Sequence, residues 1–516
     1  MSRARTIDDV FARAAREVPR AIHLVLPDGG VIPYEETYQR ARQLAGAMRA
    51  AGIVKGDRVA AFMRNSREII EVYVASGIAG AITVAINGMS SAREVERICA
   101  DCTPAGIVVE GRFLDRVSDS AAAGMRLQMV TKGGPDRPGW QGYDDLLATS
   151  PPADPLPDAA PADAAMMIYS SGTTGAPKGI LLRHSALIAN AGMTLSVLGL
   201  RDSDRVMTIL PLFSSFGHAF DFLQAGIVRA STVLLDQFDE ARAVDCIERL
   251  GVTFLAGVPT MFARMFDAPN IAGRDLSSLR LIDVGGGPVS ARLKQMLRQE
   301  LGVEVVESYG LTEISPVASV QVPFADNPLG SCGPPLPGVE VRAIRLDGRP
   351  AAVGEPGELQ FRSETFMIGY WNQPELTAST LADGWLRSGD VGRLDERGHI
   401  HILDRTKDMI VTNGFNVYPK EVENVIAELP AVQSVAVVGV PDEIAGELIH
   451  AFVVQKTGHV VSPAEVIAHC ATELSRYKVP KGVSVVDALP LTASGKIRRV
   501  ALREMLKGRK AQERSA

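Results

Sequence analysis

Cysteine is scarce in this chain, which has five cysteines among 516 residues. So few thiols exclude the disulfide framework of a small secreted protein. Cys99 and Cys102 form one CxxC pair, but no second pair follows, and the segment ERICADC has the pattern of a helix end. We therefore interpret both thiols as structural residues rather than as a metal site or a redox pair.

Histidine is also scarce, and the chain has no excess of positive charge. The eight histidines show no metal-binding spacing beyond His399 and His401, which would share one face of a short strand. The net charge is 54 − 60 = −6, which argues against a general nucleic-acid binder. Only the C-terminal end is locally basic. We interpret it as a solvated helix face, the alternative being a patch near an anionic cofactor.

The sequence shows no secretory signal and no membrane span. Residues 1–20 lack an apolar core, and their acidic residues argue against a mitochondrial presequence. The longest uncharged stretch, residues 72–91, has the length of a membrane span. It contains several glycines and polar residues, so we predict a buried helix, a turn near Gly80 and a short buried strand. We expect a cytoplasmic protein.

Length and hydrophobic content predict several packed cores. A chain of 516 residues exceeds a single core and suggests about three packing units. Helical and strand patterns alternate through most of the chain, as in a doubly wound α/β architecture. Residues 290–301, for example, place leucines and a methionine on one helical face. Residues 151–161 are proline-rich and read as a linker into the strand AAMMIYS.

A domain boundary is expected near residue 404. The segment PKEVENVIAEL begins with a proline suited to the first helical turn and continues in helical register. Two strand patterns follow, and then a helix with Ser462 as its cap. We predict two domains, residues 1–403 and residues 404–516, the second being a small α+β unit.

The segment YSSGTTGAPKG, residues 169–179, has the composition of a phosphate-binding loop. Its glycines allow close approach of the backbone to an anion, and successive N–H groups form an anion-binding nest. Hydroxyl side chains add donors, and a lysine adds positive charge. It is not a Walker A loop, and an ordinary turn is the alternative. The predicted nucleotide-binding residues are Ser170, Ser171, Gly172, Thr173, Thr174, Gly175 and Lys178.

Four further motifs decide between these alternatives. They are YGLTE at 309–313, WLRSGD at 385–390, DRTKDMIVTNGFNVYPKEVE at 404–423 and PLTASGK at 490–496. With the glycine-rich loop, they resemble in order and spacing the adenylate-forming superfamily of acyl-CoA synthetases, adenylation domains and firefly-type luciferases. The resemblance covers essentially the whole chain. It implies a large N-terminal domain of doubly wound sheets with a small barrel-like part, and a small mobile α+β lid with a hinge near 404–407.

The resemblance assigns the nucleotide site. Glu313 matches the magnesium ligand, and Thr312 matches a residue near the α-phosphate. Magnesium is usually held by one or two carboxylates together with substrate phosphates. Asp390 and Arg405 match positions that contact ribose. The residues expected around adenine are Tyr309, Gly286 and Gly287, and Gly310 is a further predicted nucleotide-binding residue.

The lid residues are also assigned by resemblance. Lys496 matches a lysine that reaches the substrate carboxylate and the α-phosphate, where a cation offsets repulsion between two anions. Lys407 matches the pivot of the lid, and Gly414 matches a glycine lining the pantetheine path. The chain departs from the pattern at Asn416, where some acyl-CoA synthetases have arginine. A pyrophosphate-facing charge is therefore missing or supplied elsewhere.

The segment 210–220 matches the lining of the acid pocket. Many carboxylic-acid synthetases have histidine where Ser214 stands, and amino-acid-activating domains have aspartate nearby. Because Ser214 has no charge, an α-amino acid is disfavoured. We expect a mostly apolar pocket whose acid does not follow from the sequence. Its predicted residues are Phe213, Ser214, Phe216, His218, Val258 and Gly285.

The resemblance predicts an ATP-dependent acid–thiol ligase that uses ATP, Mg²⁺ and CoA. A carboxylate and ATP would give acyl-AMP and pyrophosphate, and CoA would then give acyl-CoA and AMP. The expected partners are a small carboxylic acid and CoA, with an acyl carrier protein as the alternative acceptor and a homodimer as a compatible assembly. Luciferase chemistry has no specific support. A nucleotide-binding protein that has lost catalysis is the alternative from another class, and the retained Lys496, Glu313 and Asp390 argue against it.

Overall fold

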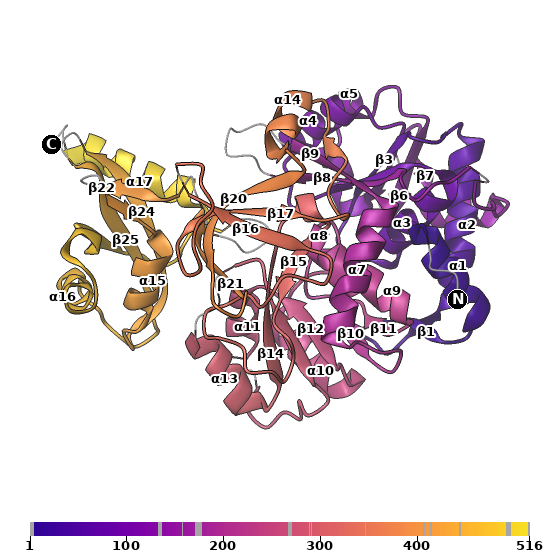
Figure 1. Cartoon of the computed structure of the whole chain (residues 1–516). Helices are drawn as coiled ribbons and strands as arrows, with labels where there is room; N and C mark the ends of the chain where they lie inside the picture. The colour runs from indigo at the N-terminus through magenta and orange to yellow at the C-terminus, as the bar shows by residue number, and fades with distance from the viewer. Residues whose placement is uncertain are drawn as a thin grey trace. The chain divides into compact units, whose positions relative to one another are not determined.

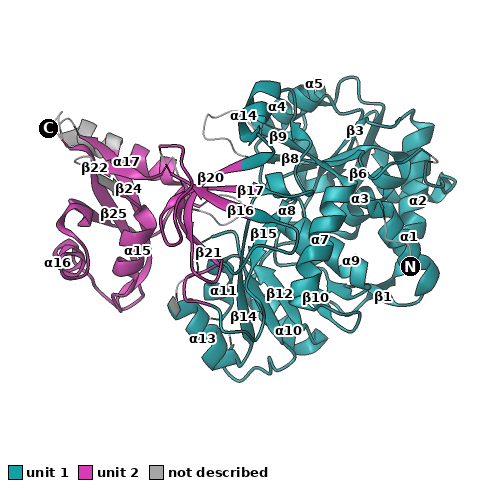
Figure 2. Ribbon diagram, in the orientation of Figure 1, with its two compact units in different colours: residues 1–327, 332–340, 362–386 teal, residues 328–331, 341–361, 387–516 magenta. Residues whose placement is uncertain are grey.

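The computed structural model describes residues 5–132, 137–156, 158–170, 178–266, 271–287, 289, 291–345, 347–405, 408–412, 415–442, 445–491 and 497–513. The chain divides into two compact units (Figures 1 and 2). Unit 1 comprises residues 1–327, 332–340 and 362–386, and unit 2 comprises residues 328–331, 341–361 and 387–516. The two units are described separately below.

Unit 1 contains an eight-stranded sheet with the strand order β18-β9-β8-β4-β3-β5-β6-β7. Its strands are β3 (Arg58–Phe62), β4 (Ile82–Ile86), β5 (Gly106–Glu110), β6 (Leu127–Thr131), β7 (Gln141–Gly142), β8 (Ala164–Ser170), β9 (Lys178–Arg183) and β18 (Gly369–Tyr370). The strands from β8 through β7 are parallel, whereas β9 and β18 are antiparallel to their neighbours. Parallel strands need both faces covered, and the central strands β3, β4 and β5 are buried on both.

Alternate side chains of β3 show the two covered faces. Val59 and Ala61 belong to the core that contains helix α3 (Arg67–Ala79), whereas Ala60 and Phe62 belong to the core that contains helix α4 (Ala92–Cys102). Such alternation is what the period of two in a strand requires when helices cover both faces. The predicted helix, turn and strand within 72–91 are confirmed. Helix α3 ends at Gly80, which has φ +68°, and β4 follows.

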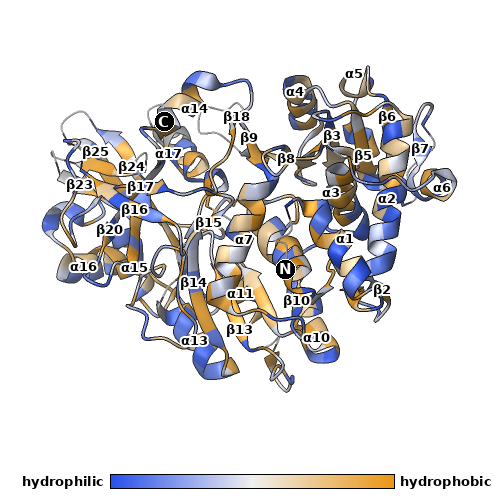
Figure 3. Ribbon diagram, turned by 45° about the vertical axis from the view of Figure 1, so that its right-hand side comes forward, coloured by the Kyte–Doolittle hydropathy of each residue, from blue (hydrophilic) through white to orange (hydrophobic). Residues whose placement is uncertain are grey.

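A second eight-stranded sheet of unit 1 has the order β15-β14-β13-β12-β10-β11-β1-β2. Its strands are β1 (Ile22–Val25), β2 (Val31–Pro33), β10 (Arg205–Met207), β11 (Ser231–Val233), β12 (Phe254–Gly257), β13 (Leu281–Val284), β14 (Glu304–Gly310) and β15 (Val317–Val320). On one face, Ile282 and Val284 pack with helices α10 (Glu240–Leu250) and α13 (Ala291–Leu301). Figure 3 shows that β13 is largely hydrophobic, as expected for a strand buried on both faces.

The other face of this sheet contacts a segment of π-helix, η2 (His218–Gln224). The rings of Phe220 in η2 and Phe254 in β12 stack with their centres 6.4 Å apart. The hydroxyl of Thr232 in β11 also donates to the main-chain oxygen of Asp221 in η2, at 3.3 Å. Helices α8 (Ser215–Gly217) and α9 (Ala225–Val228) continue η2 at its two ends. The segment after β10 therefore lies against the sheet as one continuous helix.

A third, five-stranded sheet contains β16 (Glu340–Ile344), β17 (Gly357–Arg362), β20 (Trp385–Leu394), β19 (Leu381–Ala382) and β21 (Ile400–Arg405). The fourth sheet lies in unit 2 and has the order β23-β22-β25-β24, with β26 paired to β25. Its strands are β22 (Ile410–Thr412), β23 (Phe415–Val417), β24 (Val432–Asp442), β25 (Gly446–Gln455) and β26 (Gly482–Val485). The small third sheet and this last one match the predicted barrel-like part and α+β unit.

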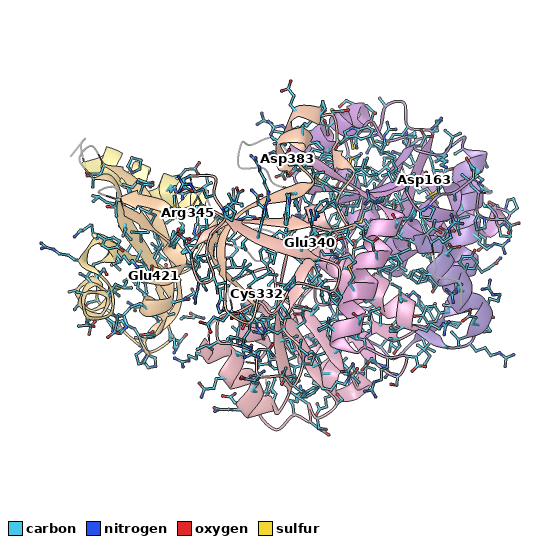
Figure 4. The ribbon with its side chains drawn as sticks, viewed as in Figure 1. Asp163, Cys332, Glu340, Arg345, Asp383 and Glu421 are labelled. Atoms are coloured by element: carbon cyan, nitrogen blue, oxygen red, sulfur yellow. The ribbon has the colours of Figure 1, made fainter. Side chains whose placement is uncertain are left out.

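Helices cover both faces of the fourth sheet. Helices α15 (Pro419–Ala427) and α16 (Pro463–Glu473) share one core with β25, and α17 (Arg499–Glu513) packs on the opposite face through Leu502. Glu421 of α15, labelled in Figure 4, accepts a hydrogen bond from Lys478 at 2.5 Å. The four sheets together confirm the predicted α/β class. Within the described part of the chain, no helix is long and apolar enough to span a membrane.

Candidate active site

The predicted phosphate loop connects two paired strands. Ser170 at the end of β8 is the cross-strand partner of Lys178 at the start of β9, and Tyr169 is paired with Gly179. The chain therefore leaves the sheet and returns to it at adjacent positions. The five loop residues predicted between these ends lie outside the described residues: Ser171, Gly172, Thr173, Thr174 and Gly175.

Lys178 and Glu313 are brought together by a residue that the sequence analysis did not identify. The Lys178 Nζ lies 5.8 Å from the centre of the Tyr370 ring. The Tyr370 hydroxyl donates to Glu313 Oε1 at 2.8 Å. Burial and the adjacent negative charge of Glu313 raise the pKa of Tyr370, so its hydroxyl remains protonated and acts as a donor. A cation, an aromatic ring and a carboxylate thus form one polar cluster.

The turn after β14 presents Thr312 and Glu313. Both residues are half-buried and lie in a short 3-10 turn, Thr312–Ile314. Gly310 precedes this turn, and a Cβ atom there would lie 1.9 Å from the main-chain oxygen of Pro316. Only glycine fits so close a backbone approach. The hydroxyls of Thr312 and Ser215 are 3.0 Å apart, so the structure adds Ser215 to the predicted site.

The glycines after β13 expose main chain beside this turn. Gly286 and Gly287 are exposed, and Gly286 has φ +71°. The nearest atom to a Cβ built on Gly287 would be Pro259 Cδ, at 3.5 Å. Strands β13 and β14 are parallel neighbours, so their carboxyl ends lie at the same edge of the sheet, where open α/β sheets bind ligands. Tyr309 and Gly310 end β14 at that edge.

The structure places the predicted acid-pocket residues in several different surroundings. Phe216 and Gly285 come together, since a Cβ on Gly285 would lie 3.0 Å from the Phe216 ring. Val258 is buried and immediately precedes helix α11 (Pro259–Met265). His218 belongs to a different ring cluster, with centre-to-centre distances of 4.8 Å to Tyr73 and 5.0 Å to Phe222. Burial lowers the pKa of His218 to about 3, so its ring is neutral at pH 7.

Ser214 and Phe213 serve local structure. Ser214 Oγ accepts from the Gly217 N–H at 3.1 Å and donates to the Pro211 main-chain oxygen at 2.7 Å. Ser214 is therefore the N-cap of helix α8, a role that serine fulfils well. Phe213 is half-buried and packs against the core that contains α3.

Three buried polar side chains near this region were not predicted. Asp283 of β13 accepts from the Ser308 hydroxyl at 3.0 Å through Oδ2, and its Oδ1 has no hydrogen-bond partner among the described residues. Burial raises the pKa of Asp283 to about 7. The side chains of Asp221 and Gln224 in η2 are fully buried and likewise lack a described partner. Their sequence signal was weak, because each polar residue stands alone in an apolar segment.

The predicted ribose contacts pair with each other in unit 2. Asp390 of β20 and Arg405 of β21 are cross-strand partners. The Arg405 Nε donates to Asp390 Oδ1 at 2.9 Å, with Asp390 buried and Arg405 exposed. The remaining lid predictions, Lys407, Gly414 and Lys496, lie outside the described residues.

The donor set around Glu313 suits magnesium better than a metal with several protein ligands. Across the described residues, no group of three or more histidine, cysteine, aspartate or glutamate side chains could hold a metal. The Glu313 carboxylate accepts a single hydrogen bond from described residues, at Oε1. A lone, oriented carboxylate is what Mg²⁺ needs when phosphate oxygens and water supply its other ligands.

Comparison with known sequences identifies the family. A family profile described as "AMP-binding enzyme" matches residues 11–371, and one described as "AMP-binding enzyme C-terminal domain" matches residues 421–496. The chain belongs to the AMP-binding enzyme family. The resemblance inferred from the motifs is thereby confirmed.

Relatives of this AMP-binding enzyme align over nearly their whole length. A feruloyl-CoA synthase of Amycolatopsis sp is 36% identical over 486 residues, covering 94% of this chain and 96% of the relative. The fatty acid–[acyl-carrier-protein] ligase ScoC of Streptomyces coeruleorubidus is 34% identical over 500 residues, covering 95% and 94%. The crystal structure of the anthranilate CoA ligase AuaEII in complex with anthranoyl-AMP superposes with a TM-score of 0.89 and 30% identity, covering 97% of each chain. These alignments confirm the predicted fold.

Proposed function

We infer that this protein is an ATP-dependent acid–CoA ligase. A carboxylic acid and ATP give acyl-AMP and pyrophosphate, and the thiol of CoA then displaces AMP to give the thioester. The observation that carries the proposal is the cluster of Lys178, Tyr370 and Glu313 within the region matched by the AMP-binding family. Relatives with CoA synthase and CoA ligase names, one of them holding an acyl-AMP, support the two half-reactions.

The cluster has the charges that adenylation requires. The acid carboxylate must approach the α-phosphate although both are anions, and negative charge develops as pyrophosphate leaves. Lys178 supplies a cation at the end of the phosphate loop, and the Thr312 and Ser215 hydroxyls supply donors beside Glu313. We propose that Glu313 holds Mg²⁺, which when bound would neutralise phosphate charge.

We propose that unit 2 residues complete the two half-reactions. Asp390 would accept hydrogen bonds from ribose hydroxyls, with Arg405 orienting its carboxylate at 2.9 Å. Lys496 would contact the acid carboxylate and the α-phosphate. Residues 404–516 would act as a lid that turns at Lys407 after adenylation, and Gly414 would then leave room for pantetheine. The adenine contacts proposed are Tyr309, Gly286 and Gly287, with Gly310 as a further nucleotide-binding residue.

The acid is proposed to lie beside Phe216, Val258 and Gly285. Phe216 and Phe220 make an edge-to-face pair with ring centres 4.9 Å apart, which gives that wall an apolar character. Ser214 carries no charge, and its hydroxyl caps α8. An α-amino acid is disfavoured because Ser214 has no negative charge to hold an ammonium group. We also propose a cytoplasmic location, and a homodimer stays a prediction.

A second candidate function is loading of a carrier-protein thiol. It is favoured by the 34% identity to ScoC, which is named as an acyl-carrier-protein ligase. Both functions share the adenylation half-reaction and differ only in the thiol that attacks acyl-AMP. CoA is the first choice because the feruloyl-CoA synthase aligns at 36% identity.

The test measures the nucleotide product and the acceptor in one experiment. The purified protein is incubated with ATP, Mg²⁺ and aromatic, aliphatic and dicarboxylic acids, with CoA, with a phosphopantetheinylated carrier protein, or with neither. Acid-dependent AMP and an acyl-CoA thioester are expected. Acyl-AMP that is transferred only to the carrier protein would favour the second function. Formation of ADP, or of no acid-dependent product, would overturn the ligase assignment.

A further inference from the structure

The segment 367–371 lies between two parts of the candidate nucleotide site. Its Met367 N–H donates to the Glu313 main-chain oxygen at 2.8 Å. On the other side, β18 within this segment pairs with β9, the strand that leaves the phosphate loop. The Trp371 N–H also donates to the Gly179 main-chain oxygen at 2.7 Å. The main chain of one short segment is therefore bonded both to the Glu313 turn and to the end of the phosphate loop.

The side chains of this segment repeat the same connection. The Tyr370 hydroxyl donates to Glu313 Oε1 at 2.8 Å, and its ring lies 5.8 Å from Lys178 Nζ. The Trp371 indole N–H donates to the main-chain oxygen of Asp101 at 3.1 Å. A phenylalanine would fill the space of the Tyr370 ring, whereas at Trp371 it would remove ring volume as well as the N–H. The Tyr370 hydroxyl and the Trp371 indole N–H thus both donate to residues that border the site.

Asp101 connects Trp371 to the strand that leads into the loop. Asp101 is the next-to-last residue of α4, and its carboxylate accepts from the Tyr169 hydroxyl at 2.5 Å. Tyr169 is the next-to-last residue of β8. Burial, together with Cys102 and Asp101, raises the pKa of Tyr169, so its hydroxyl remains a donor. Through Asp101, both ends of the phosphate loop are bonded to one helix end.

We propose that Tyr370 and Trp371 are positioning residues that hold the strand ends bordering the phosphate loop, at Tyr169 and Gly179, at a fixed separation from the Glu313 carboxylate. Tyr370 orients Glu313, and Trp371 acts with Asp101 and Tyr169 on the two strand ends of the loop. The proposal rests on the proposed function, because it takes the loop as a phosphate site and Glu313 as a cation ligand. Neither residue is catalytic in this scheme, since each acts through another group.

Orientation by Tyr370 has a specific consequence for the cation. A neutral hydroxyl donor holds one carboxylate oxygen without removing the negative charge. Glu313 keeps its other oxygen for Mg²⁺, in an orientation set before ATP arrives. Loss of that hydroxyl should weaken the response to Mg²⁺ while leaving the acid site unchanged. Loss of a tyrosine with a purely structural role would not change the response to Mg²⁺ separately from the acid site.

The first experiment compares Tyr370→Phe with Tyr34→Phe. The control loses an equally short hydroxyl contact, 2.8 Å to the Ala230 main-chain oxygen, at a buried site in helix α2 (Tyr34–Ala50). Binding of a fluorescent ATP analogue is titrated with Mg²⁺ in the absence of acid. We expect Tyr370→Phe to raise the half-saturating Mg²⁺ concentration about tenfold, as for a hydrogen bond to a charged group, and Tyr34→Phe to leave it unchanged. Equal Mg²⁺ curves for the two variants would overturn the role of Tyr370.

The second experiment tests the connection through Asp101. Trp371→Phe and Tyr169→Phe are measured alone and together for ATP affinity. Because both act through Asp101, the loss in the double variant should be smaller than the product of the single losses, which we expect to be about threefold each. Hydrogen exchange of a peptide covering 178–183 in nucleotide-free protein should accelerate in Trp371→Phe. Independent losses together with unchanged exchange would overturn the connection.

Failure of the ligase assignment is distinguishable from failure of this proposal. Both experiments use ATP binding or hydrogen exchange and need neither acid nor CoA. A wild-type protein that binds ATP with Mg²⁺ but makes no acyl-AMP would overturn the ligase and leave the positioning role standing. A wild-type protein whose ATP binding ignores Mg²⁺ would overturn the role of Tyr370 directly.

Discussion

Two polar regions of unit 1 differ in their burial and in their hydrogen bonding. Around Glu313, the polar groups are half-buried and partnered: Tyr370 donates to Glu313, and Thr312 is bonded to Ser215. In η2, Asp221 and Gln224 are fully buried and have no described hydrogen-bond partner. Partnered groups next to solvent can exchange partners with a ligand, whereas unpartnered groups in the core cost free energy.

The backbone of η2 is also unusual, because it is π-helical. Single turns of π-helix are rare, and they occur often at functional sites. η2 continues the segment that begins with the predicted acid-contacting residues Ser214 and Phe216. The polar groups around Glu313, which are proposed to bind the nucleotide, are stabilised by their own contacts, whereas the unpartnered groups of η2 lower the stability of the protein. Substitutions in the two regions should therefore change different quantities.

The largest expected effect is that of Asp283→Asn on the pH dependence of the unfolding free energy. Its pKa of about 7 in the folded protein lies above the ordinary 3.8, so the folded state binds this proton more tightly than the unfolded state. This contribution to stability is present at low pH and is lost as the pH rises from about 4 to about 7. Three pKa units correspond to roughly 4 kcal/mol. Asp283→Asn should remove that part of the decline.

Urea unfolding at several pH values checks this prediction. The measured quantity is the difference in unfolding free energy between wild type and Asp283→Asn, since other buried acids contribute equally to both proteins. The difference should grow in favour of the variant as the pH rises. A difference that does not vary with pH would show that Asp283 does not titrate in this range.

Glu313→Gln should lower the rate of adenylation without affecting the stability of the protein. Loss of one preorganised charged group at a reacting centre typically lowers the rate by about 10²–10³-fold. The glutamine keeps an oxygen for the Tyr370 hydroxyl, so the thermal unfolding midpoint should remain near that of wild type. Acid-dependent pyrophosphate exchange and a thermal melt check both parts. Near-normal exchange would contradict the assignment of Glu313.

Gln224→Met should make the unpartnered region more stable. Methionine has a similar shape and removes two buried polar atoms that lack described partners. Relief of an unsatisfied amide is expected to raise the unfolding free energy by about 1–3 kcal/mol. Chemical denaturation measures the change, with Gln237→Met at an exposed, partnered side chain as the control. A destabilised Gln224→Met protein would indicate that the amide is satisfied by water.

Ser214→Ala should have the smallest effect and distinguishes its two interpretations. As the N-cap of α8, the hydroxyl contributes about 1 kcal/mol to stability. The variant should lose that amount with the ranking of acid substrates unchanged. If instead the acid ranking changes at constant stability, Ser214 contacts the substrate, and the acid site extends to the start of the helix.

Local patterns were enough to predict much of the fold. The apolar stretch 72–91 became α3, Gly80 and β4, because a glycine with positive φ ends the helix. The helix expected at 290–301 is α13, and Ser462 with Glu465 forms the predicted cap of α16. In these segments the signal is contained within a few residues. Cap and periodicity rules therefore apply directly.

The contacts that organise the candidate site could not be predicted in this way. Tyr370 reaches Glu313 across 57 residues, and Ser215 reaches Thr312 across 97 residues. No periodicity links such positions, because the topology of two sheets brings them together. Similarly, the packing of the His218 ring with Tyr73 and Phe222 could not be predicted, and its place in the acid pocket stays a prediction. The sequence predicts that residues 210–220 line the acid pocket. Which side chains of the segment face the pocket depends on the geometry of the helix.

The pairing of Ser170 with Lys178 also has a consequence for protein engineering. The seven residues 171–177 begin and end at adjacent positions of a hairpin, so their replacement need not alter the strands. The entropy of closing a loop grows slowly, with each doubling of its length costing only about 0.6 kcal/mol. The segment is therefore an exchangeable cassette. Libraries of loop sequences inserted there would test whether residues 171–177 determine the predicted phosphate binding, with the flanking strands unchanged.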